Sequence, residues 1–190
     1  MGPPFHPDPM PSPFAHAVAG LAIGAAMRPR GPVPARWWVA GAVCAALPDL
    51  DVIAFRFGVP YESMLGHRGI SHSLFIAAAF AALLVGAGFR GSDGATARRA
   101  FVYLFLATAS HGLLDAFTDG GLGPALLAPF TGTRYFFPWQ PIRVAPLGLA
   151  RFFSSEGGRV LASEAVWVLI PSLLLAAASQ AFRRRSLATP

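Results

Sequence analysis

The chain has 190 residues, of which 54% are hydrophobic and only 13% are charged, and its formal net charge is +6. This length fits one domain, and so apolar a composition excludes an ordinary soluble domain and indicates a membrane protein. All fifteen basic residues are arginines, and they stand at the ends of apolar runs rather than in one continuous stripe. We therefore expect a lipid bilayer around the chain and no nucleic-acid partner.

Five apolar stretches follow one another along the chain. They cover residues 14–27, 37–50, 70–89, 101–117 and 160–182. Only the third and the fifth approach the length of about 20 residues that a helix needs to cross a bilayer core of about 30 Å. We predict an all-α, multi-pass membrane helical bundle of about five helices, forming a single domain over residues 14–185. A proline-rich tail (1–13) without the basic start of a signal peptide is expected to be disordered, and residues 186–190 form a C-terminal tail.

Arginines mark one end of the predicted helices. Groups of three follow the first, third and fifth stretches: Arg28, Arg30 and Arg36; Arg90, Arg98 and Arg99; Arg183, Arg184 and Arg185. Short cytoplasmic loops are enriched in basic residues. Five helices of alternating direction would therefore place all nine arginines on the cytoplasmic side.

Histidines and carboxylates occupy the opposite ends of the same helices. His16 opens the first, Asp49 and Asp51 close the second, His67 and His72 precede or open the third, His111 and Asp115 end the fourth, and Glu164 opens the fifth. Polar groups scattered at random would divide between both sides of the membrane. The grouping predicts one site on the extracytoplasmic side.

The spacing of these residues suits metal ligands. His67 and His72 can converge if the backbone turns at Gly69, and His111 and Asp115 lie one turn apart on one helix face. Each pattern also has a simpler interpretation, such as a histidine–aspartate hydrogen bond, an acidic helix end or an interfacial histidine. Together they predict a site for one or two divalent ions, with zinc favoured and manganese or magnesium also compatible with nitrogen and oxygen ligands.

A long segment rich in glycine, proline, aromatic residues and arginine separates the fourth and fifth stretches, at residues 120–158. No membrane span fits there, so we expect a long loop on the same side as the site. Its aromatic residues suit the lipid headgroup region. A lid or interfacial rim and a simple cap over the helix ends are equally compatible with this composition.

Three blocks resemble those of the membrane-bound metal-dependent hydrolase family, also called YdjM-like. They are LPDLD at 47–51, HRGISHS at 67–73 and HGLLDAFT at 111–118, and the resemblance extends roughly from Phe14 to Pro171. It implies a multi-pass protein of the bacterial inner membrane, distantly similar to the zinc-dependent phospholipase C and P1 nuclease superfamily. Those relatives are helical, bind metals through His and Asp, and hydrolyse phosphoesters.

The resulting hypothesis is a membrane hydrolase of a phosphoester or ester, acting on a small-molecule or lipid substrate at the headgroup region. The predicted metal ligands are His16, Asp49, His67, His72, His111 and Asp115. Asp51 would be a bridging ligand or general base, Glu164 a base or a partner of the ligands, and Arg68 a phosphate-binding residue, with Arg134 and Ser71 as weaker substrate contacts. The alternative is a non-enzymatic membrane metal-binding protein or a transporter. A transport path needs polar residues through the membrane depth, whereas here they crowd one end.

Overall fold

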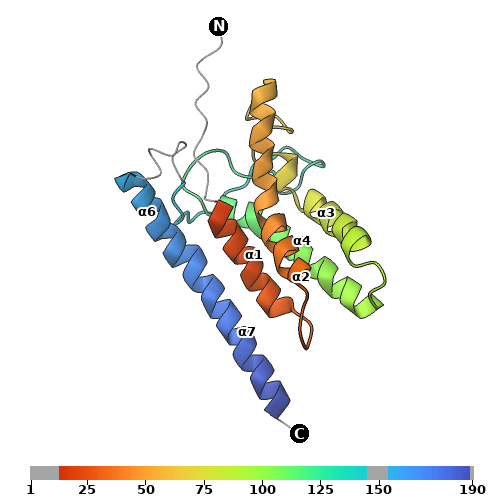
Figure 1. Ribbon diagram of the computed structural model, residues 1–190. Coiled ribbons are helices and arrows are strands. Elements are labelled where there is room, and N and C mark those ends of the chain that lie inside the picture. The colour runs from red at the N-terminus through yellow and green to blue at the C-terminus, as the bar shows by residue number, and fades with distance from the viewer. Residues whose placement is uncertain (1–12, 145–153, 189–190) are drawn as a thin grey trace.

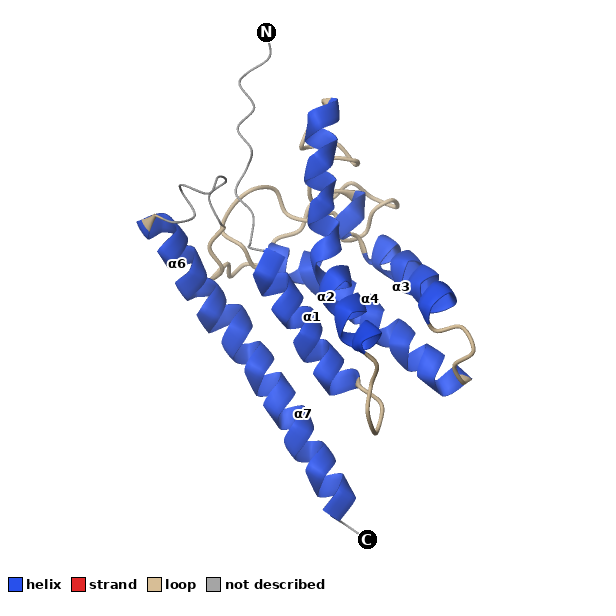
Figure 2. Cartoon of the chain, viewed as in Figure 1, coloured by secondary structure: helices blue, strands red, loops and turns tan. Residues whose placement is uncertain are grey.

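The structure is a computed structural model that describes residues 13–144 and 154–188, with side chains described up to residue 185. Within these residues every element is a helix, apart from one isolated bridge between Thr118 and Ile142. The predicted all-α class is therefore confirmed (Figure 2). The expected disordered tail, apart from Pro13, lies outside the described residues, as do the last two residues of the predicted C-terminal tail.

The helices alternate in direction, and the ends that carry the predicted ligands gather on one side (Figure 1). In chain order they are α1 (Pro13–Met27), α2 (Ala35–Ala46), the 3₁₀ helices η1 (Leu47–Phe57) and η2 (Ile70–His72), α3 (Leu74–Gly88), α4 (Gly94–Ala116), α6 (Ser155–Glu164), the π-helical segment η3 (Ala165–Leu169) and α7 (Ile170–Ala188). Helix α1 packs against α2, α4 and α7, and α3 packs against α4.

Small residues bring α1 and α2 into close contact. A Cβ atom added to Gly20 would lie 2.6 Å from the carbonyl oxygen of Gly41, so both helix backbones approach without side chains between them. Four residues after Gly20, Gly24 continues this face, which is the spacing used by helices that associate in membranes. The packing of α1 on α2 therefore depends on glycine.

An aromatic pair fills the core next to these glycines. The ring of Tyr103 stacks on that of Trp37 with centroids 4.7 Å apart, and both side chains are buried. The indole Nε1 of Trp37 donates a hydrogen bond of 3.1 Å to the carbonyl of Gly24. Leu104, Ala107 and other apolar side chains complete this cluster, so the middle of the bundle is a packed hydrophobic core.

Within the part of the chain that the structure describes, two helical stretches are long and apolar enough to cross a membrane, Ala35–Phe57 and Ser155–Arg185. The expectation that the third apolar stretch is one of the two long ones was wrong, because α3 has only 15 residues. It begins after Ser73, whose Oγ accepts a hydrogen bond from the N–H of Ile76 and caps the helix. The second stretch is instead extended by η1, which ends where Gly58 adopts a left-handed conformation with φ 75°.

The fifth helix begins earlier than predicted, so Glu164 does not open it. Ser154 caps α6 by accepting a hydrogen bond from the N–H of Glu156, and Glu164 is the last residue of α6, ten residues later. A wider turn follows as η3, just before Pro171. Because proline has no N–H, the hydrogen-bond ladder must change there.

The described part of the long loop, which follows Phe117 and runs to Val144, crosses the ends of the helices. The N–H of Ala125 donates to the carbonyl of Arg68, and the N–H of Phe137 donates to the carbonyl of Ala116. Phe130 and Trp139 remain exposed on the outer surface. The loop therefore caps the bundle and also presents aromatic residues outwards.

Candidate metal centre

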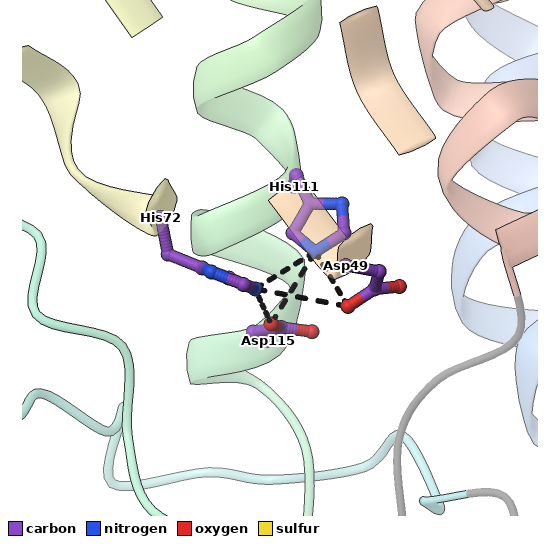
Figure 3. Close-up of side chains that lie close together, drawn as sticks. All are labelled: Asp49, His72, His111 and Asp115. Atoms are coloured by element: carbon purple, nitrogen blue, oxygen red, sulfur yellow. Dashed lines mark hydrogen bonds and ion pairs between the residues drawn. The ribbon is translucent and has the colours of Figure 1, made fainter. Parts of the chain in front are cut away.

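Four side chains from three separate segments point towards one another at the capped end of the bundle (Figure 3). Asp49 lies in the first turn of η1, His72 ends η2, and His111 and Asp115 occupy the last two turns of α4. All four are buried. Residues that the sequence spaces far apart thus form one enclosed polar group.

Their ligand atoms are separated by distances that suit a single ion. The Nε2 atoms of His72 and His111 are 3.0 Å apart. Oδ2 of Asp115 lies 3.1 Å from His72 Nε2 and 3.6 Å from His111 Nε2. Oδ1 of Asp49 lies 3.2 Å from His111 Nε2 and 3.7 Å from His72 Nε2. A tetrahedral zinc ion with bonds of about 2.0–2.1 Å requires separations of about 3.3 Å between its ligand atoms.

Hydrogen bonds behind the two imidazoles direct their Nε2 lone pairs inwards. Nδ1 of His111 lies 2.6 Å from the carbonyl oxygen of Ala45, which can only accept, so Nδ1 carries the proton. Nδ1 of His72 faces the carboxylate of Asp51 at 3.2 Å. The same reasoning places its proton on Nδ1, and this arrangement is typical of metal-binding histidines.

The atoms of the four side chains that face one another are consequently all acceptors, and the guanidinium of Arg68 stands beside them, with its Nε 3.3 Å from Oδ2 of Asp115. Two Nε2 lone pairs face each other, and within the described residues neither carboxylate, that of Asp49 or that of Asp115, receives a hydrogen bond. A proton on one imidazole would satisfy one or two of these contacts and leave the others repulsive. A divalent cation would satisfy all four at once, so the donor set fits a bound metal.

Asp51 has a different environment from Asp49. Its carboxylate accepts hydrogen bonds from the backbone N–H of Arg68 at 3.1 Å and from the hydroxyl of Ser71, and it lies 2.6 Å from Nδ1 of His67 and 3.2 Å from Nδ1 of His72. These contacts occupy its lone pairs. The geometry suits a carboxylate that orients two histidines.

The other two predicted ligands flank the group of four. The ring of His16 stacks on that of His111 with centroids 3.7 Å apart, and its Nε2 is 3.6 Å from Oδ1 of Asp115. His67 forms a second group of possible ligands with Asp51 and His72. Its Nε2 is buried and has no hydrogen-bond partner within residues 13–144 and 154–185.

Arg68 holds Asp115 and the loop together. Its Nε lies 3.3 Å from Oδ2 of Asp115, and one terminal nitrogen donates to the hydroxyl of Thr118 and to the carbonyls of Gly120 and Leu122. The other terminal nitrogen is buried without a hydrogen-bond partner among the described residues. A fixed guanidinium with a free donor beside the cluster can bind an anionic oxygen.

Gly66, just before the HRGISHS block, and Gly69 within it allow a tight backbone turn around this arginine. A Cβ atom on Gly69 would lie 2.2 Å from the carbonyl oxygen of Met64, and one on Gly66 would lie 2.2 Å from that of Pro60. Arg68 itself has a φ of 59°, which non-glycine residues rarely adopt. The block therefore serves the fold of the turn as well as its polar groups.

The remaining predicted residues lie around the cluster. Ser71 lies 3.0 Å from Nδ1 of His72 and donates to Asp51. The guanidinium of Arg134 donates to five backbone carbonyls, those of Tyr61, Glu62, Ser63, His67 and Gly123. Burial lowers the pKa of Arg134 below its usual value, although an arginine remains a cation at neutral pH. Glu164 is buried on α6 and belongs to neither group of possible ligands.

Sequence reasoning missed two groups that support the cluster. One is the carbonyl of Ala45, which fixes the ring of His111, and no sequence signal marks a backbone acceptor. The other is Thr118, whose hydroxyl accepts from Arg68 and donates to the carbonyl of Asp115. Its position three residues after Asp115, at the end of the HGLLDAFT block, was the available clue.

The chain was compared with known protein families, curated proteins and solved structures. The sequence model of a family described as "YdjM inner membrane protein" matches residues 10–186. The chain belongs to this family. The inner membrane protein YbcI of Escherichia coli (strain K12) is 40% identical to the chain over 166 residues, which cover 87% of this chain and 95% of that protein. No solved structure matches the chain. Membership of the YdjM family confirms the predicted resemblance and the membrane class.

Proposed function

We propose that this YdjM-family protein is a metal-dependent hydrolase of a phosphoester or ester, with a divalent cation held by Asp49, His72, His111 and Asp115. The observation that carries the proposal is the convergence of four buried acceptor atoms without a donor between them. Zinc is the favoured ion because two imidazole nitrogens and two carboxylate oxygens at tetrahedral separations form a common zinc ligand set. When bound, such an ion lowers the pKa of a coordinated water and polarises the bond to be cleaved.

The surrounding residues take supporting parts in this proposal. Asp51 orients His72 through Nδ1, and Ser71 keeps Asp51 in place. Arg68 fixes Asp115 and offers its free terminal nitrogen to a developing negative charge. His16 stands next to Asp115 and can complete the coordination, whereas His67 belongs to the second group with Asp51 and His72. Arg134 positions the loop that carries His67. We assign no catalytic role to Glu164.

A substrate in the lipid headgroup region is supported by the surface around the capped end. Phe57 and Phe130 are both 81% exposed there, and Trp139 is 57% exposed. Exposed aromatic side chains of this kind are typical of membrane–water interfaces. The arginine-rich helix ends lie on the opposite side, which supports an extracytoplasmic location for the centre.

The enclosure of the four ligands favours a second candidate, a structural metal centre without hydrolase activity. His111 and Asp115 are both 0% exposed, and structural zinc sites are typically closed. A transporter is less well supported, because the middle of the bundle is filled by Trp37, Tyr103 and Leu104 rather than by a polar path.

Metal content and turnover separate these functions. We expect protein purified in detergent to contain stoichiometric divalent metal by inductively coupled plasma mass spectrometry. His111→Ala and Asp115→Ala should lose most of it, whereas Glu62→Gln, which changes an exposed carboxylate of the same end, should keep it. Wild-type metal content in His111→Ala would overturn the centre.

Each metallated form would then be screened with phospholipids and generic phosphoesters in the presence of zinc, manganese or magnesium. The hydrolase proposal expects turnover that Asp115→Ala abolishes and Glu62→Gln preserves. Stoichiometric metal without turnover of any substrate would instead support the structural centre.

A further inference from the structure

Four arginines line a single cavity at the opposite end of the bundle from the metal centre. The cavity measures about 760 Å³, and its lining includes Arg28, Arg30, Arg99 and Arg183. These side chains come from the turn after α1, the first turns of α4 and the last turns of α7. Three segments that are distant in sequence thus direct positive charge to one place.

The cavity is separate from the metal centre. Met27, which also lines the cavity, lies eleven positions after His16 in α1, which corresponds to about 17 Å along a helix. Along α4, twelve residues separate Arg99 from His111, or about 18 Å. The apolar core around Tyr103 fills the space between the two. A ligand in the cavity therefore cannot contact the histidines.

The positive charges in the cavity have no counter-charge in its lining. None of the lining residues is aspartate or glutamate, and the guanidiniums of Arg28, Arg30 and Arg99 all repel that of Arg183. Arg183 is nevertheless held in place by a hydrogen bond of 2.7 Å to the carbonyl of Ala26. Four cations that line one cavity, one of them held by a backbone carbonyl, form a favourable site for an anion, and guanidinium groups match the oxygen atoms of a phosphate.

Apolar side chains in the same lining indicate that the anion also has an apolar part. Met27 and Phe182 lie beside the arginines, and Phe182 is 73% exposed. Along α7, Leu174 and Leu175 continue this exposed apolar surface towards the middle of a helix long enough to cross the membrane. A ligand bound here would place its negative group on the arginines and its apolar part along α7.

We propose that this cavity binds the phosphate group of an anionic phospholipid, with the acyl chains lying along α7. Basic pockets between transmembrane helices at the cytoplasmic surface are suited to anionic lipid headgroups. The inference is independent of the proposed hydrolase, because it involves neither the His/Asp cluster nor turnover.

The test compares two double variants that remove the same charge from the same end of the molecule. Arg28→Gln with Arg99→Gln removes two lining residues, and Arg98→Gln with Arg184→Gln removes two neighbours that do not line the cavity. Binding of phosphatidylglycerol, cardiolipin and phosphatidylcholine to purified protein would be measured by native mass spectrometry and by lipid titration in detergent. Each arginine near an anionic headgroup contributes roughly a fivefold change in affinity, so the lining variant should bind the anionic lipids about 30-fold more weakly. The control variant should bind them nearly as the wild type does.

Several results would overturn the proposal. Equal losses in both double variants would show diffuse surface charge rather than a site. Equally tight binding of phosphatidylcholine would show that the ligand needs no net negative charge. Binding of inorganic phosphate as tightly as the lipids would identify a free anion as the ligand. Circular dichroism and gel filtration will show whether the lining variant folds. If it does not, the variant Arg28→Lys with Arg99→Lys keeps the charge and should bind the anionic lipids with intermediate affinity. Unchanged affinity in that variant would refute recognition by the guanidinium groups.

Discussion

Replacement of Asp51 by asparagine tests how the centre holds its metal. The carboxylate lies within hydrogen-bond distance of Nδ1 of both His67 and His72, and it also accepts from the N–H of Arg68 and the hydroxyl of Ser71. Asparagine keeps the size and loses one acceptor oxygen. Whichever way its amide is oriented, an N–H₂ group then faces a donor, so one histidine loses the contact that fixes its proton on Nδ1. For His72, a shift of that proton to Nε2 would block a metal ligand.

The size of the effect follows from the cost of losing such an orienting carboxylate, about 10- to 100-fold in metal affinity. At a metal concentration of 100 times the wild-type Kd, binding stabilises the folded protein by about 2.7 kcal/mol. A tenfold weaker Kd reduces this contribution to about 1.4 kcal/mol, and a 100-fold weaker Kd reduces it to about 0.4 kcal/mol. Asp51→Asn should therefore lose about 1.3–2.3 kcal/mol of metal-dependent stability.

The assay is a competition titration with a chromophoric chelator, followed by thermal unfolding in detergent with and without metal. Glu62→Gln is the control, because it removes an exposed carboxylate near the same end. An unchanged Kd in Asp51→Asn would refute the orienting role. Complete loss of metal, equal to that of His111→Ala, would also refute it, because it would make Asp51 a ligand in its own right.

Three further predictions concern packing, the loop and topology. Gly41→Ala places a methyl group 1.6 Å from the hydroxyl oxygen of the buried Tyr103 on α4 and should destabilise the protein by about 1–3 kcal/mol in thermal unfolding. Gly86→Ala, with nothing within 4 Å, should stabilise it by about 0.5–1 kcal/mol. Equal effects would contradict the close packing of α2 against Tyr103. Arg134→Lys should raise hydrogen exchange in residues 61–67, because one ammonium group cannot donate to the five carbonyls that the guanidinium contacts. Unchanged protection would refute the role of Arg134 in holding this segment. The native Cys44 is buried, so single cysteines introduced by Glu62→Cys or Arg98→Cys can be labelled by thiol reagents with little background. The Glu62→Cys protein should be labelled from outside intact cells, and the Arg98→Cys protein only after permeabilisation. The reverse pattern would invert the topology.

Much of the molecule could be predicted from composition and from the ends of the apolar stretches. The membrane class, the all-α fold and the family follow from the apolar runs and the three blocks, and the gathering of His16, Asp49, His111 and Asp115 at one end follows from alternation of the helices. Helix lengths were less predictable. Hydropathy does not indicate that α2 continues as a 3₁₀ helix to Phe57, or that a serine cap starts α6 before the apolar run.

The sequence by itself determined which residues can act as ligands and which end of the helices they occupy. The reason is that the position of a polar residue within an apolar helix sets its depth in the membrane. Only the tertiary structure decided which of these residues contact one another. It separates Asp49, which faces His111 and His72, from Asp51, which accepts from several donors, although the two are only two residues apart in the same segment. It also joins Arg28, Arg99 and Arg183 around one cavity. Such distinctions depend on contacts between distant segments, which the packing of α1, α2, α4 and α7 creates and local sequence does not encode.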